Sequence, residues 1–146
     1  YVFQLKHLKE NGVDAHKDLA SISESKSQDD IVYAIRAGLA DVGFIKSGLL
    51  EAMTKEGRIS LDEFEIVDKA NDGFPQLHTT KLYPEWMVTV SDKIAANQTT
   101  KIKTALIALK PENAASVKAK IKGFVEPLSL AELAETLREL RLPPYH

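Results

Sequence analysis

Apolar residues recur three and four positions apart in several stretches of the chain, which is the spacing of an amphipathic helix. Leu5 and Leu8 share one face of the first stretch, and Gly12 follows as a favoured helix stop. Ser27 opens another stretch, with Asp30 placed to complement the positive end of a helix. The pattern predicts a first helix that begins at or before Tyr1 and runs to residue 11. Further helices are predicted over residues 27–39, 47–57, 94–109, 113–121 and 129–142.

Short apolar or alternating stretches lie between these helices and predict strands. They cover residues 19–23, 41–45, 64–67 and 86–90. Capping-box patterns at Ser60 and Ser129 mark the starts of a single helical turn and of the last helix. Because strands alternate with helices through the first half, we predict an α/β fold class with a mostly parallel sheet flanked by helices.

The amino-acid composition excludes several classes of protein. The 146 residues suit one domain, and a hydrophobic content of 44% with 27% charged residues indicates a folded chain. The net charge of −2 argues against a nucleic-acid platform, which would carry a basic excess. No apolar run reaches about 18 residues, so no membrane span is predicted. The first residue is Tyr1 rather than Met, so we expect a fragment or a processed product.

The chain carries no recognisable catalytic or metal-binding motif. The absence of cysteine excludes thiol catalysis, disulfides and thiolate metal sites. The four histidines show no metal-ligand spacing, and neither a glycine-rich phosphate loop nor a nucleophile elbow is present. The residues alone therefore give the enzyme hypothesis no motif to rest on, and we predict no metal or cofactor.

Two segments carry candidate ligand-binding residues. In the first, Lys46 and Ser47 stand where a predicted strand ends and a helix begins. Ligands of parallel α/β sheets lie at the carboxyl ends of strands, and backbone N–H groups at a helix start attract anions. Lys46 adds a positive charge and Ser47 a hydroxyl donor. The alternative is that Ser47 merely caps the helix and that Lys46 is solvated.

The second segment runs from His78 to Trp86, between two predicted strands. It gathers the hydroxyls of Thr79 and Thr80, a titratable imidazole and the phenol of Tyr83, and loops on a rigid scaffold often carry function. The alternative is a structural crossover with buried aromatics, which we favour for Trp86. The candidate ligand-binding residues are Lys46, Ser47, His78, Thr79, Thr80 and Tyr83.

A family resemblance runs through nearly the whole chain. It rests on residues 3–14 (FQLKHLKENGVD), 37–47 (AGLADVGFIKS), 82–86 (LYPEW) and 137–145 (LRELRLPPY). In this order and spacing they resemble the phosphate/phosphonate-binding family of periplasmic substrate-binding domains. The last two stretches are most similar to the branch that serves as extracytoplasmic sensors of bacterial two-component histidine kinases.

The resemblance implies a type II periplasmic-binding-protein-like architecture, in which two α/β lobes close on a ligand around a hinge. The chain corresponds to the second lobe, about residues 1–90, and a C-terminal helical segment, about 91–146, with the first lobe largely missing. Lys46 and Ser47 fall at cleft positions, and residues 78–80 fall near the hinge crossover. The implied ligand is a phosphonate or another small anion.

The same resemblance implies a sensor domain of an inner-membrane histidine kinase, on the periplasmic side, which binds its ligand without turnover and is not itself an enzyme. Its partners would be a small anionic ligand and the missing first lobe of the same parent protein, with no nucleic acid. Apolar surface left open by the missing lobe makes a homodimer a further expected assembly. Two alternatives stay open: a substrate-binding component of a phosphate/phosphonate-type ABC transporter, and a small cytoplasmic α/β enzyme.

Overall fold

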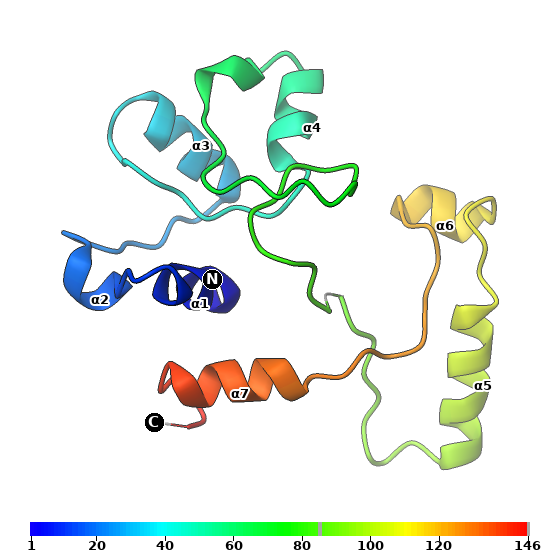
Figure 1. Cartoon of the computed structure of the whole chain (residues 1–146). Coiled ribbons are helices and arrows are strands. Elements are labelled where there is room, and N and C mark those ends of the chain that lie inside the picture. The colour runs from blue at the N-terminus through cyan, green and yellow to red at the C-terminus, as the bar shows by residue number, and fades with distance from the viewer. Residues whose placement is uncertain (85, 146) are drawn as a thin grey trace. The chain divides into compact units, whose positions relative to one another are not determined.

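The computed structural model describes residues 1–84 and 86–145, so residue 85 of the 82–86 stretch lies outside the described residues (Figure 1). All six predicted helices are confirmed, with their ends shifted by a few residues, and a short additional helix follows the first. The elements are α1 (Val2–Glu10), α2 (Ala15–Asp18), α3 (Gln28–Arg36), α4 (Leu49–Lys55), the 3₁₀ turn η1 (Leu61–Glu63), α5 (Ala96–Ile107), α6 (Ala114–Ala119) and α7 (Ala131–Glu139).

Side-chain caps fix several of these helix starts. The Ser27 hydroxyl accepts a hydrogen bond from the Asp30 backbone N–H at 3.1 Å, as the sequence predicts. At η1, the Glu63 carboxylate accepts from the Ser60 backbone N–H at 2.7 Å, which is half of the predicted capping box. Such caps satisfy backbone donors that have no partner inside the helix.

The prediction of a parallel sheet is wrong for the described residues. The described residues form no strand, and 41% of them are helical, so the α/β fold class with a mostly parallel sheet does not hold. The segments 19–23, 41–45, 64–67 and 86–90 run as irregular chain instead. An apolar run favours an extended segment, but a strand also needs a neighbour whose backbone groups face its own.

Side chains supply part of the hydrogen bonding that a neighbouring strand would have supplied. The Gln28 carboxamide oxygen accepts from the Lys46 backbone N–H at 2.8 Å, at the end of one predicted strand. The Thr79 hydroxyl donates to the Val67 carbonyl at 2.7 Å, at the end of another. These two bonds hold the segments in place without a ladder.

Two compact units make up the chain: the larger unit, residues 1–82 with the chain from 133 onward, and the smaller unit, residues 83–132. The core of the larger unit lies where α3 and α4 meet. Val32 is 1% exposed and Met53 fully buried. Burying a side chain of this size contributes about 1.5–3 kcal/mol. The cluster consists of Val32, Leu50, Met53 and Ile59, with Tyr33, Ile45, Leu49, Leu61, Phe64 and Ile66 packed around it.

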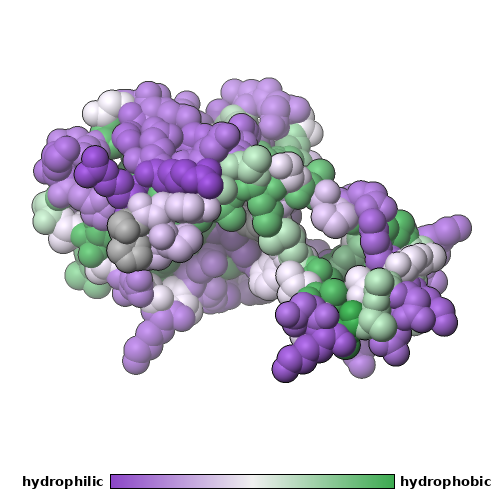
Figure 2. All heavy atoms as spheres, turned by 90° about the horizontal axis from the view of Figure 1, so that it is seen from below, coloured by the Kyte–Doolittle hydropathy of each residue, from purple (hydrophilic) through white to green (hydrophobic). Residues whose placement is uncertain are grey.

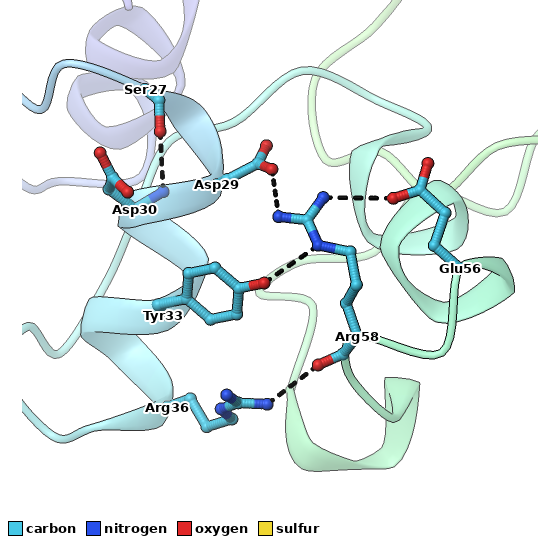
Figure 3. Close-up of polar contacts among 7 residues, drawn as sticks. All are labelled: Ser27, Asp29, Asp30, Tyr33, Arg36, Glu56 and Arg58. Atoms are coloured by element: carbon cyan, nitrogen blue, oxygen red, sulfur yellow. Dashed lines mark hydrogen bonds and ion pairs between the residues drawn. The ribbon is translucent and has the colours of Figure 1, made fainter.

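Arg58 ties α3 to the segment that follows α4, at the edge of this core (Figure 3). Its guanidinium pairs with the Asp29 carboxylate, donates to the Tyr33 hydroxyl at 3.0 Å and donates to Glu56 at 3.2 Å. Arg36 donates to the Arg58 carbonyl at 3.1 Å, and both guanidiniums lie over the Tyr33 ring. The two guanidinium carbons lie 5.1 and 5.6 Å from the ring centroid, within the range of cation–π attraction.

Polar contacts hold α1 and α7 in the larger unit. The Lys9 ammonium donates to the Glu139 backbone carbonyl at 3.2 Å and pairs with its carboxylate at 3.5 Å, which joins α1 to α7 (Figure 1). His7, also on α1, bonds to the Asp68 carboxylate through Nε2 at 2.8 Å. These contacts place α1 beside the irregular segments.

The smaller unit buries little apolar surface. Every buried hydrophobic residue of the described chain belongs to the larger unit, whereas Ile102, Val117 and Val125 of the smaller unit are exposed. Figure 2 shows hydrophobic and hydrophilic side chains interspersed on the surface. Lys103 pairs with Glu126 at 2.6 Å, which joins α5 to the chain after α6. No helix within residues 1–84 and 86–145 is long and apolar enough to cross a membrane.

We predict that Gly43→Ala destabilises the larger unit by about 1–3 kcal/mol, because it overpacks the contact with α3. An added Cβ would lie 2.3 Å from Cγ2 of Ile31 and 2.9 Å from Cδ1 of Ile35. Urea unfolding measures the free energy. Combining Gly43→Ala with Ile31→Ala, which removes the nearest clash, should reduce the cost. Equal costs in the two backgrounds would contradict the close approach.

Candidate functional site

A cavity of about 390 Å³ lies in the larger unit between α1, α3 and α4. Its walls include the segments 41–48, 63–67 and 77–80. The sixth predicted site residue, Tyr83, belongs to the smaller unit, and its role in ligand binding stays a prediction. The structure brings the other five to the cavity: Lys46, Ser47, His78, Thr79 and Thr80.

Lys46 and Ser47 stand on the turn that leads into α4. The Lys46 backbone N–H is taken by the Gln28 side chain, so it is not free to bind an anion. Gly48 has a φ of 85°, and the place of a Cβ there is filled by the Gln76 carboxamide. Gly48 is the N-cap of α4 and no side chain caps this helix, so the alternative role of Ser47 as a cap is wrong.

The side chains of this turn remain open to solvent. Lys46 and Ser47 are both exposed, and neither the Lys46 ammonium nor the Ser47 hydroxyl has a hydrogen-bond partner among residues 1–84 and 86–145. An ammonium carries three donors and a hydroxyl one. The turn therefore offers four side-chain donors, one formal positive charge and no committed partner at the cavity wall.

The loop that carries His78 is fastened at several points. The Glu51 carboxylate on α4 accepts from the Leu77 backbone N–H at 2.6 Å. The His78 carbonyl accepts from the Ala70 N–H at 2.9 Å, and the Thr79 hydroxyl reaches Val67. These bonds run to separate parts of the larger unit and place residues 77–80 along the cavity.

His78 is only 8% exposed, which is low for an ionisable side chain. Its Nδ1 lies 3.0 Å from the Gln76 carbonyl oxygen and its Nε2 lies 3.2 Å from the Asp72 carboxylate. The Phe74 ring meets the imidazole edge-on, with centroids 5.3 Å apart. The Gln76 carbonyl raises the pKa of His78, and Asp72 adds to this rise against the opposing effect of burial. The Phe74 backbone N–H lowers the pKa of Asp72, and His78 adds to this effect.

The two threonines already use their hydroxyl protons. Thr79 donates to the Val67 carbonyl at 2.7 Å, and Thr80 donates to the Lys81 carbonyl at 3.1 Å. A hydroxyl has one proton to donate and two lone pairs to accept. Each threonine can therefore donate to an anion only by leaving its backbone partner, whereas the Lys46 ammonium is ready to bind.

Carboxylates on the cavity wall were missed by the sequence analysis. Asp41, Glu51, Glu63 and Glu65 all line the cavity. Glu51 is engaged by the Leu77 N–H and Glu63 by the Ser60 N–H. The capping box identified Glu63 as a helix-start residue, but no spacing rule relates these acids to Lys46. The cavity therefore combines one lysine with several acidic groups.

The part of the chain that the structure describes contains no group of three or more His, Cys, Asp or Glu side chains placed to hold a metal ion. The pair of His78 and Asp72 has no third such ligand beside it in that part. The arrangement suits reversible binding of a small polar molecule through donors and charge.

Comparison with known proteins identifies the family. The family model described as the phosphonate-binding periplasmic substrate-binding protein of ABC transporters matches residues 1–131. The chain therefore belongs to the family of phosphonate-binding periplasmic substrate-binding proteins. Comparison with curated proteins and with solved structures gave no match.

Membership of this family establishes the general function of the chain. Members of this family bind substrate and do not convert it, and their ligand is a small anion. Their location is extracytoplasmic. The predictions of a non-enzymatic binding domain and of a small anionic ligand are therefore confirmed at this level, and a small cytoplasmic enzyme is excluded.

Proposed function

We propose that the chain is the ligand-binding part of an extracytoplasmic sensor domain in a two-component sensor histidine kinase. The anion would bind in the cavity beside Lys46 and Ser47. The observation that carries the site is that two donor-bearing segments, distant in sequence, line the same cavity. The sensor role rests on the resemblance of residues 82–86 and 137–145 to the kinase-sensor branch.

The Lys46 ammonium supplies the charge of the proposed site. Charge-assisted hydrogen bonds to an oxyanion are about twice as strong as neutral ones, and this ammonium has no competing partner in the described chain. Ser47 adds a neutral donor from the same turn. Thr79 and Thr80 complete the set once an anion draws their hydroxyls from the Val67 and Lys81 carbonyls.

The proposed mechanism is binding without turnover. In a two-lobed parent domain, the ligand bridges both lobes and stabilises the closed form by its higher affinity for that form. Closure in a membrane-anchored kinase would move the helix that leads to the membrane. The signal is then the population of the closed form, which the ligand concentration sets.

Replacing Lys46 should weaken anion binding. We expect Lys46→Gln to lower the affinity of the chain for methylphosphonate by about tenfold or more, because a charged hydrogen bond is worth about 1.5–3 kcal/mol. Calorimetric titration at fixed ionic strength measures the ratio of the two dissociation constants. The matched control is Lys55→Gln, which removes the same charge from α4 outside the cavity lining.

Equal affinities for Lys46→Gln and Lys55→Gln would contradict the site. The same titration should include inorganic phosphate, sulfate, acetate and an amino-substituted alkylphosphonate. Preference for the amino compound would indicate that cavity carboxylates such as Asp41 and Glu65 take part. No binding of any of these anions would overturn the proposed ligand class.

The second candidate function is the substrate-binding component of an ABC transporter, which the description of the matching family favours. The coding sequence of the parent protein separates the two. A membrane span and a kinase domain after residue 146 are expected for the sensor. A stop codon immediately after this region, together with a neighbouring permease, would instead support the transporter component.

A further inference from the structure

His78 faces a hydrogen-bond acceptor on each side of its ring. Nδ1 is 3.0 Å from the Gln76 carbonyl oxygen, which can only accept. Nε2 is 3.2 Å from an oxygen of the Asp72 carboxylate, which also only accepts when ionised. A neutral imidazole carries one N–H, so it can satisfy just one of these contacts, whereas the imidazolium donates to both.

Because His78 is buried, a neutral imidazole would leave one of these two contacts without a hydrogen bond. With 8% of the residue exposed, little water is available to satisfy the nitrogen that would lack a proton. In the neutral ring that nitrogen would direct a lone pair at an acceptor oxygen, losing a hydrogen bond and adding repulsion. The geometry is satisfied in full only by the doubly protonated ring.

The ring sits at the centre of the loop that forms one wall of the cavity. Its two partners, Asp72 and Gln76, lie on the chain before it, and Phe74 covers its edge at 5.3 Å between centroids. The next two residues, Thr79 and Thr80, line the cavity together with His78 itself. The contacts that hold the ring therefore contribute to the position of that wall, beside the hydrogen bonds made by Leu77 and Thr79.

We propose that Asp72 and the Gln76 carbonyl hold His78 as an imidazolium, and that this charged clasp positions the 77–80 wall of the ligand cavity. His78 is a positioning residue in this role, because both of its N–H groups are already used. The link to ligand binding rests on the proposed function; the charge state of the ring does not.

Other charged groups line the same cavity as His78. They come from α1, from the turn before α4, from α4 and from the chain around η1. Another titratable pair, His7 with Asp68, joins α1 to the chain before the loop. The groups that line the same cavity are His7, Asp41, Lys46, Glu51, Glu63 and Glu65.

The clasp predicts a direction of pH dependence. The folded-state pKa of His78 is raised above 6.5, its ordinary value, by the Gln76 carbonyl and by Asp72. A group with a raised folded-state pKa contributes its full stability below the unfolded-state pKa and loses it as pH rises through the folded value. The 77–80 wall is therefore ordered at mildly acidic pH and loosens above 6.5.

Nitrogen-15 NMR of the histidine rings in the whole chain tests the clasp directly. At pH 6 both ring nitrogens of His78 should give imidazolium shifts, with a titration midpoint above 6.5. The amide signals of Leu77, Thr79 and Thr80 should shift with that same midpoint. Asp72→Asn should lower the midpoint of His78, whereas Asp68→Asn, which removes the carboxylate beside the other cavity histidine, should leave the midpoint of His78 nearly unchanged.

A neutral His78 ring at pH 6, or a midpoint that Asp72→Asn leaves in place, would overturn the clasp. A ligand titration separates this outcome from failure of the proposed function. Methanesulfonate is the probe, because its charge is constant across this pH range, and its affinity should fall severalfold as pH rises through the His78 midpoint. If the ring titrates as expected but no anion binds, the clasp stands and the proposed function fails.

Discussion

The packing of α3 against α4 is the contact on which the larger unit depends. Val32 and Met53 are almost wholly removed from water there, and Arg58 closes the edge of the contact through Asp29 and Tyr33. The apolar contact stabilises the packing but does not fix the orientation of the helices, because the hydrophobic effect is non-directional. The Arg58 side chain is about one-third exposed, so its ion pairs add geometric specificity more than stability. Together they fix the spacing of the two helices.

The cavity follows from that spacing. The Lys46 turn enters α4 and is bonded back to Gln28 at the start of α3, so both helices determine where the turn lies. Glu51, in the first turn of α4, then fastens the loop that carries His78. The packing of α3 against α4 therefore determines the positions of both donor-bearing segments of the cavity lining. Within residues 1–84 and 86–145 the Lys46 ammonium has no bonded partner, which is the property that a site for a small anion requires.

The sequence was informative where local chemistry decides the outcome. Helical spacing and caps such as Ser27 located the helices, and donor content directed attention to Lys46 and His78 before any geometry was known. The prediction of a sheet was wrong because strand pairing depends on partners that are distant in sequence. At the end of one expected strand, the Gln28 side chain accepts the backbone hydrogen bond instead. The acidic cavity residues were missed for the same reason, because tertiary packing brings them together. Asp72 was missed because the conformation of the loop between it and His78 follows no spacing rule.

The central claim is that one cavity, lined by two distant segments around Lys46 and His78, receives a small anion. Backbone amide NMR of the nitrogen-15-labelled chain during titration with methylphosphonate tests it most directly. The account predicts that signals from residues 44–48 and 76–80 shift together along one saturable curve. Saturable shifts confined to the lysine-bearing helices of the smaller unit, with both cavity segments unmoved, would contradict it.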